Sequence, residues 1–434
     1  MVRSFFIFFL LTIGISVSMA QNKWMWTEVT SLPISTTNNA LCEAKTATKK
    51  FVYSFGGVSD SLKITDIHQR VFKYYTNNDS WEEMPMIPDT AGKTGSMASY
   101  VNNKIYLIGG NYHPNDSTAI SSNKVFVYNP NQDIFEAEGA DLITPIADHV
   151  QAVWRDSLIY VVSGWSNSTI LMDVQIYNPF DDTWFSGTPL PNDEIFSSHG
   201  ASGFILGDTI FFYGGVNENA IDNKKYIIKG VIDKDIPSQI TWSYINSNLG
   251  TSIFRGACSG FDKSIFWVGG ADEAYQLNGK TLDSTTYVNP NQRLMTVNLE
   301  EKTQVNSFDP KNNVMDLRGI ANLGGGNWMI AGGIDSTHVA TNRAFLLHNP
   351  TLSNIGKALN PAYFEVIDLK DDFVILTENI GELKVYDLSG GVLYISPKYL
   401  ADLIIPRYLL PKGLLLFVYE DSINLPLVIK KVNP

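Results

Sequence analysis

Short apolar stretches that end in a pair of small residues recur at a nearly constant interval along the chain. The six pairs are Gly56-Gly57, Gly109-Gly110, Ser163-Gly164, Gly214-Gly215, Gly269-Gly270 and Gly332-Gly333. Successive pairs are 53, 54, 51, 55 and 63 residues apart. An apolar stretch of four or five residues before a turn is typical of a buried β-strand. The interval predicts six copies of one all-β unit, because a repeat of this length indicates an array or a propeller.

A second marker follows each of the first three pairs. A strand ends near a tyrosine, a turn rich in Asn, Pro and Asp comes next, and an aromatic residue follows: Tyr75 with Trp81, Tyr128 with Phe135, and Tyr177 with Trp184. Such turns between alternating stretches predict tight hairpins. The two markers together resemble the kelch repeat, and six copies span Trp26 to Pro350. The resemblance implies a six-bladed β-propeller, with four-stranded sheets around a central channel and the Tyr and Trp packed between blades.

The ends of the repeat region predict how the ring closes. Trp26 to Val29 precedes the first full repeat and has the pattern of a fourth strand. The sixth repeat has no fourth strand of its own before Asn349-Pro350. The N-terminal strand is therefore expected to complete the last blade, which would remove the exposed sheet edges.

After Asn349 the glycine register stops, and short alternating strands run from Phe364 to Val432. This pattern predicts a small antiparallel β-sandwich domain. The segment resembles the C-terminal sorting domain of type IX secretion substrates in Bacteroidetes, through Asn360-Pro361, Val385 to Gly390, Leu410 to Gly413 and Lys430-Lys431-Val432. That resemblance implies contact with secretion machinery and passage across the outer membrane. Gly391 and Leu414-Leu415 depart from the family pattern, which puts surface attachment in question. The alternative is a structural domain that caps the propeller.

The N-terminus has the layout of a signal peptide. Arg3 precedes an uncharged, mostly apolar stretch from Ser4 to Val17, and Ser18 and Ala20 suit a cleavage point before Gln21. We therefore predict a signal peptide over residues 1–20, a propeller over 21–355 and the C-terminal domain over 356–434. The protein is expected to be secreted or held at the outer cell surface after passing through the periplasm. A retained membrane anchor is the alternative, but the apolar stretch is short for a membrane span.

Charge and hydropathy limit the expected binding partners, and the positions of the cysteines bear on disulfide formation. The net charge is −12 and no basic run is present, so nucleic acid is not an expected partner. No segment after the N-terminus has 18 consecutive apolar residues, so an integral membrane protein is not expected. Cys42 and Cys258 fall in blades one and five with blade six between them. They are therefore expected to be free thiols, because a disulfide needs Cα atoms within about 7 Å.

Motifs for metal or cofactor chemistry do not occur. The chain has six His, no Cys-x-x-Cys and no His-Glu-x-x-His, so neither a metal nor a cofactor is predicted. Gly324-Gly325-Gly326 precedes a strand without a following helix and is not a phosphate loop. No serine nucleophile elbow is present, and no catalytic residue can be assigned.

One set of basic residues does share a position in the repeat. Fifteen residues before the second small residue of a pair lie Cys42, Gly95, His149, Arg255 and Arg318, and His199 is one step out of register. His149, His199, Arg255 and Arg318 are therefore expected at one mouth of the channel. They could hold a carboxylate or a sugar acid, or they could brace neighbouring loops. Long connections at 58–70, 111–123 and 271–292 are expected on the same face, where binding usually occurs.

Two functions fit these features, and the sequence favours binding over catalysis. The first is an exported or cell-surface binding module that recognises protein or glycan through its loop face. The second is a carbohydrate-active enzyme, because the bacterial N-acetylneuraminate epimerases are also exported six-bladed kelch proteins. Their pattern places Glu directly after a small pair and Arg several residues on. Here Val216 and Asn217 follow the pair Gly214-Gly215, Glu218 comes later, and no Arg lies between this pair and Lys224.

Overall fold

The computed structural model describes residues 24–45, 49–115, 118–217, 226–246, 252–309, 311–350, 352, 364–368, 372–377, 381–396, 403–421 and 427–433. The predicted signal peptide over residues 1–20 and the predicted domain boundary at 355–356 lie outside these residues. No helix in the described part of the chain is long and apolar enough to cross a membrane.

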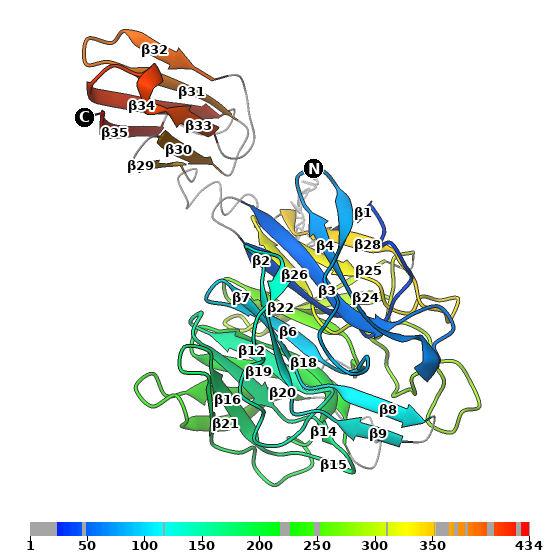
Figure 1. The fold of residues 1–434 in the computed structure, drawn as a ribbon. Helices are drawn as coiled ribbons and strands as arrows, with labels where there is room; N and C mark the ends of the chain where they lie inside the picture. The colour runs from blue at the N-terminus through cyan, green and yellow to red at the C-terminus, as the bar shows by residue number, and fades with distance from the viewer. Residues whose placement is uncertain are drawn as a thin grey trace, which may run out of the picture.

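Six four-stranded antiparallel sheets make up the larger part of the molecule, and Figure 1 shows their strands fanned around a common centre. Blade one contains β2 (Ala40–Lys45), β3 (Lys50–Val58), β4 (Ile67–Tyr75) and β5 (Ser80–Met84). Blade two contains β6 (Met97–Val101), β7 (Lys104–Ile108), β10 (Val125–Asn129) and β11 (Ile134–Phe135). Blade three contains β12 (Val150–Trp154), β13 (Leu158–Val162), β16 (Val174–Asn178) and β17 (Thr183–Ser186). Blade four contains β18 (His199–Leu206), β19 (Thr209–Val216), β20 (Tyr226–Ile232) and β21 (Ile240–Asn246). Blade five contains β22 (Ala257–Phe261), β23 (Ser264–Val268), β24 (Arg293–Asn298) and β25 (Thr303–Phe308). Blade six contains β26 (Ala321–Gly324), β27 (Asn327–Ala331), β28 (Ala344–His348) and β1 (Met25–Val29).

The innermost strands β2, β6, β12, β18, β22 and β26 surround a cavity of about 570 Å³ along the channel. Each strand contributes lining residues, among them Cys42, Tyr100, Val153, Phe204 and Ser259. The sheets and the shared channel establish the all-β, propeller-type fold expected from the repeat.

The predicted closure is confirmed. Strand β1 pairs antiparallel with β28 along its whole length, with Trp26 opposite Leu347. Trp24, just before this strand, lies in the core between blades five and six. Its Nε1 donates a hydrogen bond to Thr296 Oγ1 at 3.1 Å, and its ring lies 4.6 Å from Phe266. The N-terminal segment therefore closes the ring through a sheet edge and through side-chain packing.

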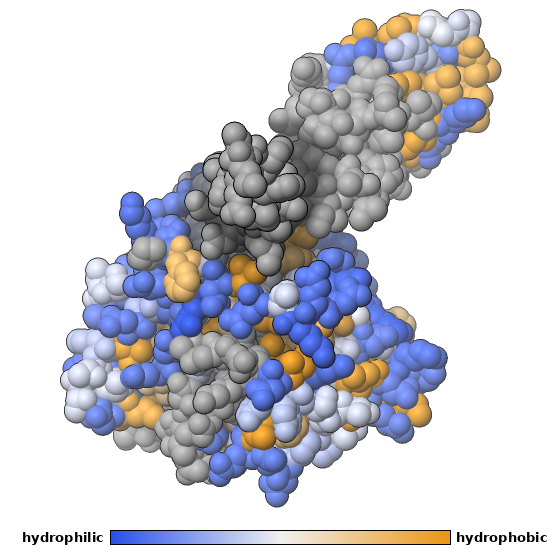
Figure 2. Space-filling model, turned by 180° about the vertical axis from the view of Figure 1, so that it is seen from behind, coloured by the Kyte–Doolittle hydropathy of each residue, from blue (hydrophilic) through white to orange (hydrophobic). Residues whose placement is uncertain are grey.

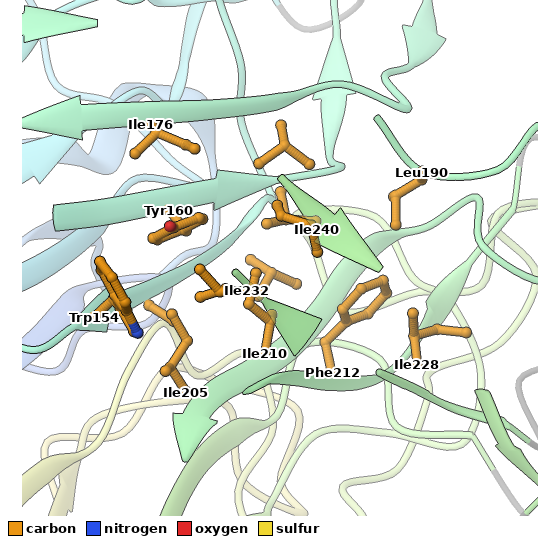
Figure 3. Packing of buried hydrophobic residues seen from close by; sticks show 14 of the residues in the cluster. Trp154, Tyr160, Ile176, Leu190, Ile205, Ile210, Phe212, Ile228, Ile232 and Ile240 are labelled. Atoms are coloured by element: carbon orange, nitrogen blue, oxygen red, sulfur yellow. The ribbon is translucent and has the colours of Figure 1, made fainter. Parts of the chain in front are cut away.

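The blades are held together by apolar side chains between neighbouring sheets, as the kelch resemblance implied. Tyr128 of blade two packs edge-on against Phe55 of blade one, and Tyr177 of blade three packs against Tyr106 of blade two. Between blades three and four, Figure 3 shows one such cluster, with Trp154 and Tyr160 facing Ile210 and Phe212 across the gap. Burial of this much apolar area is the main stabilising term for the ring.

The small pairs are small because the inner backbone is crowded. Gly214 has a φ of +82°, which an L side chain rarely adopts. A Cβ there would overlap the carbonyl oxygen of Ile253 in the next blade. The glycine therefore lets two blades approach at the point where their loops begin.

The C-terminal strands form two further antiparallel sheets. One contains β29 (Phe364–Asp368), β30 (Asp372–Thr377) and β33 (Leu403–Pro406); the other contains β31 (Gly381–Tyr386), β32 (Val392–Ile395), β34 (Gly413–Asp421) and β35 (Leu427–Asn433). Residues of both sheets share one buried cluster, in which the rings of Phe373 and Phe417 lie 5.0 Å apart. Leu388, Val392 and Val432 are exposed, and Figure 2 shows apolar surface on this part of the chain. This segment has a core of its own.

Candidate binding site at the loop mouth

Six residues in left-handed backbone conformation surround one end of the channel, one from each blade. Their φ angles lie between +52° and +72°, and the six are Asn38, Gly95, Asp148, Gly200, Arg255 and Asp316. Backbone hydrogen bonds join neighbours: Asp148 N donates to Gly95 O, Gly200 N to Asp148 O, and Arg255 N to Gly200 O. Asn38 N donates to Asp316 O, and Asn38 Oδ1 accepts from Gly95 N. We call these six residues the mouth ring. It is a rigid frame from which side chains project.

The mouth ring differs in register from the set predicted by a fixed fifteen-residue spacing. Gly95 and Arg255 are in it, whereas His149 follows its ring residue, His199 precedes its own, and Arg318 lies two positions past Asp316. The spacing fails because the first hairpins differ in length. Strand β2 ends at Lys45 and β3 begins at Lys50, whereas β6 ends at Val101 and β7 begins at Lys104.

Two arginines and two aspartates meet beneath the mouth ring. Arg255 Nη2 donates to Asp148 Oδ2 at 2.6 Å, and Arg318 forms an ion pair with the other oxygen of Asp148. Arg255 Nη1 lies 3.5 Å from Asp316 Oδ1, and Asp316 also accepts hydrogen bonds from Thr37 and Asn38. The side chains of Arg318, Asp148 and Asp316 are at most 5% exposed. We call these four side chains the ion cluster; its formal charges sum to zero.

Burial and charge act in opposite directions on the ion cluster. Burial alone would raise the pKa of Asp148, but Arg255 and Arg318 together lower it well below its usual range. Asp148 is therefore ionised at any pH near neutrality. Because each arginine already has a carboxylate partner, the cluster braces the inner ends of blades three, five and six against one another.

A cavity of about 350 Å³ opens above the ion cluster, among the long loops. Arg255 and Asp148 form part of its floor. Its walls come from the blade-two hairpin β8 (Asn111–Asn115) with β9 (Thr118–Ser121), from the blade-three hairpin β14 (Trp165–Ser166) with β15 (Thr169–Ile170), and from the blade-five insert. We call this space the loop pocket. Two of the predicted long connections, 111–123 and 271–292, line this hollow, whereas the third, 58–70, contributes Leu62 to the buried cluster that contains Tyr275.

Aromatic rings form a continuous wall of the loop pocket. Trp165 lies 5.4 Å from His199, His199 lies 5.8 Å from Phe254, and Phe254 lies 5.2 Å from Tyr275. The guanidinium of Arg255 lies 5.0 Å from the Phe254 ring centroid. A buried cluster that includes Leu62, Tyr275 and Ile334 supports the wall from behind. The pocket is therefore built on packed loops from several blades.

The structure places the four residues predicted for the channel mouth in different surroundings. Arg255 and His199 line the loop pocket. Arg318 lies below it in the ion cluster, and His149 is fully buried, with its Nε2 3.0 Å from Gln151 Oε1. Burial lowers the pKa of His149 to about 4, so this histidine is neutral at pH 7. Arg255 and Arg318 are brought together, but around Asp148.

Several pocket and cluster residues were absent from the sequence prediction, namely His113, Asp148, Trp165, Tyr275 and Asp316. A signal for two of them was present. Asn, Asp and Gly tolerate left-handed backbone, and five of the six ring positions carry one of these types. A register anchored on such residues would have selected Asp148 and Asp316. Trp165 and Tyr275 lie in loops whose lengths differ between blades, so the repeat carries no signal for them.

The opposite end of the channel has a different lining. Cys42 and Cys258 both face the 570 Å³ channel cavity and are free thiols. Burial raises the pKa of both thiols, which keeps them protonated. Within the described residues, no three His, Cys, Asp or Glu side chains are grouped closely enough to hold a metal ion.

Comparison with known proteins shows that part of the chain is similar to kelch-like proteins. No protein-family model matches the chain. Kelch-like protein 36 of Bos taurus is 32% identical over 174 residues, which are 38% of this chain and 26% of that protein. Kelch-like protein 15 of Gallus gallus is 26% identical over 188 residues, which are 42% of this chain and 34% of that protein. The match thus spans about a third or less of these relatives.

A solved structure gives the same fold. The structure of YjhT superimposes with a TM-score of 0.59 and 13% identity, over 73% of this chain and 96% of that one. At this identity the likeness concerns the fold alone. Together with the repeat, the six sheets and the kelch-like relatives, it supports a kelch-repeat β-propeller.

Proposed function

We propose that the protein is an exported binding module, displayed at or released from the cell surface, that recognises a protein or glycan ligand through its loop face. The observation that carries this proposal is the loop pocket, which is lined by loops of several blades over a braced floor. Pockets of about 300–1,000 Å³ with apolar walls and a few polar groups are typical binding sites. The kelch-like relatives support a binding role for the propeller.

Binding should be detectable with the whole mature chain on a panel of glycans, sugar acids and extracellular proteins. A ligand of the loop face should lose affinity when Leu282, an exposed pocket residue, is changed to Arg, which would place a long charged side chain at the entrance. The matched control is Phe308→Arg, at an exposed apolar position on the outer strand β25. Equal loss in both variants, or binding to neither variant nor parent, would contradict recognition through the loop face.

The second candidate is a sugar epimerase or mutarotase. It is favoured by the presence of His113, His199 and Arg255 around one pocket, because anomeric ring opening requires proton transfer to and from the sugar oxygens. Exchange between the anomers of N-acetylneuraminate, followed by NMR, tests this activity directly. Acceleration that vanishes in His199→Gln would favour the enzyme over the binding module.

Export through the C-terminal domain is a separate part of the proposal. It is supported by the resemblance to sorting domains and by the domain's own hydrophobic core. Deleting residues 360–434 should leave a folded propeller in the periplasm, as measured by cell fractionation and protease protection. Normal surface delivery of the shortened protein would rule out a sorting role and favour the structural alternative.

A further inference from the structure

The four strands of the larger C-terminal sheet all reach one end of the domain. Strand β31 ends and β34 begins there, because Tyr386 lies opposite Leu416. Strand β35 ends there as well, since Val432 lies opposite Leu414, and this end is marked C in Figure 1. Strand β32 begins beside them, with Val392 opposite Tyr386. Residues that are far apart in the sequence are therefore brought together at this end.

The turn that precedes β34 is held at the same end of the domain. It contains the short helix η2 (Arg407–Leu409), and Asn433 of β35 ties it down. The Nδ2 atom of Asn433 donates to Leu410 O at 2.9 Å and lies 3.2 Å from Arg407 O. Asn433 is 5% exposed, so water competes little for these hydrogen bonds. The backbone that presents the side chains of this turn is therefore fixed by the fold.

Five large apolar side chains are exposed at this end, each over more than half of its surface. They are Leu388, Val392, Tyr408, Leu409 and Val432. We call these five side chains the apolar tip. The outer face of an antiparallel sheet usually carries polar side chains, and a group of exposed apolar ones marks an interaction site. The apolar tip is therefore expected to have a partner.

Positive charge borders the apolar tip. In residues 387–392, 407–414 and 429–433 the basic residues are Arg407, Lys412, Lys430 and Lys431, and the one acid is Asp387. The formal side-chain charges of these segments therefore sum to +3, whereas the whole chain has a net charge of −12. Lys412 and Lys430 are exposed, and Asp387 accepts hydrogen bonds from the N–H groups of its own turn. This end of the domain thus has the opposite sign from the chain as a whole.

The shape and charge of this end suit a membrane surface. Tyr408 is 85% exposed on a turn, so it projects outward and could enter a soft interface without a matching cavity. Tyrosine is enriched where a bilayer meets water, and lysines next to such a surface are attracted by anionic lipids. A second copy that presented the same surface across a two-fold axis would bring like charges together. Charge complementarity therefore favours an anionic bilayer over self-association.

We propose that the apolar tip docks the protein onto a membrane surface that contains anionic lipids, with Tyr408 and Leu409 in the interface and Lys412 and Lys430 at the lipid phosphates. Shallow insertion of a few apolar side chains with basic neighbours gives reversible attachment. This goes beyond the function proposed above, because it gives the C-terminal domain its own contact with a cell surface. It does not depend on any ligand of the loop face.

Co-sedimentation of the full mature chain with lipid vesicles tests the docking. One set of vesicles contains equal amounts of phosphatidylglycerol and phosphatidylcholine, and the other contains phosphatidylcholine alone. Binding to the anionic vesicles should be more than about tenfold tighter, because each of the two exposed lysines contributes about fivefold. The preference should diminish as the salt concentration rises, since salt screens charges at a surface.

The double variant Tyr408→Ser, Leu409→Ser tests the apolar contribution. It should weaken binding to the anionic vesicles by at least about tenfold, because two exposed apolar side chains no longer enter the interface. Its melting temperature should match that of the parent. The matched control Phe180→Ser, Met86→Ser removes two exposed apolar side chains from the propeller and should bind like the parent.

A single substitution tests the charge contribution. Lys412→Gln should weaken binding to the anionic vesicles about fivefold and leave binding to phosphatidylcholine unchanged. The control is Lys234→Gln, at an exposed lysine of the propeller, which should bind both vesicles like the parent.

Three results would overturn the docking proposal. The first is an absence of parent binding to the anionic vesicles, and the second is equal binding by the parent and the double variant. The third is unchanged vesicle binding by the double variant together with a loss of its surface delivery or of a dimer. That result would assign the apolar tip to a protein of the secretion machinery or to a second copy of the chain.

Discussion

Replacing Asp148 with asparagine is expected to destabilise the propeller by about 3–5 kcal/mol. This carboxylate pairs with both Arg255 and Arg318, which are themselves buried or nearly so. The asparagine keeps the size of the side chain and tolerates the left-handed backbone at this position. What it removes is the negative charge, so Asp316 alone would face two guanidinium groups. Leaving a buried charge without its partner typically costs this much.

Chemical denaturation followed by far-UV circular dichroism measures the effect of Asp148→Asn. The matched control is Glu300→Gln, which removes the carboxylate of an exposed ion pair with Lys263 and should change the midpoint little. Equal midpoints for Asp148→Asn and the parent would show that the ion cluster does not brace the blades.

The stability of the parent protein and that of Asp148→Asn should depend differently on pH in the acid range. The pKa of Asp148 is lowered in the folded protein, so its contribution is complete above the unfolded value of about 3.9 and is lost as the pH falls toward the folded value. The stability difference between the parent and Asp148→Asn should therefore be constant from pH 7 to about pH 5 and shrink below about pH 4.

Replacing Trp24 with alanine is expected to cost about 3–5 kcal/mol, which is typical when a buried tryptophan is truncated. Trp24 is 4% exposed and contacts Phe261, Phe266 and Trp328 at the junction of blades five and six. The change would also leave Thr296 Oγ1 without its donor. Because this residue anchors the strand that closes the ring, the variant should also be cleaved faster by protease near its N-terminus.

The adjacent residue provides the control for Trp24→Ala. Met25 is half exposed on β1, so Met25→Ala should leave both the unfolding midpoint and the cleavage rate close to the parent. Similar effects of the two substitutions would mean that the N-terminal segment stabilises the ring through backbone pairing alone.

The repeat predicted the fold well because both of its markers have a steric origin. The small pairs lie where neighbouring backbones approach, as at Gly214, and the tyrosines lie between blades, as at Tyr128 and Tyr177. Both requirements recur in every blade or nearly so. Closure by β1 followed from counting strands, since the sixth repeat had one too few.

The binding site was predicted less well, for two physical reasons. The connection between the first two strands is one residue longer in blade three than in blade two, which displaced the predicted ring from Asp148 to His149. In blade six the pairing of β26 with β27 has a register shift between Asn322 and Gly324, which contributes to the displacement from Asp316 to Arg318. The sequence also does not show which charged side chains form ion pairs with one another. Arg255 and Arg318 therefore looked available for an anionic ligand, although in the structure each forms an ion pair with a carboxylate. Tyr275 comes from an insert that one blade alone carries, which no repeat can predict.

The pairing of Met25 with His348 has a consequence for the order of events during synthesis. The strand that completes the last blade leaves the ribosome before the other strands of the propeller and has no partner until the sixth repeat has followed. A contact so distant along the chain forms slowly, because a very long loop must close before it contributes any free energy. Until then a partial ring exposes a strand edge at each end, where other chains can pair.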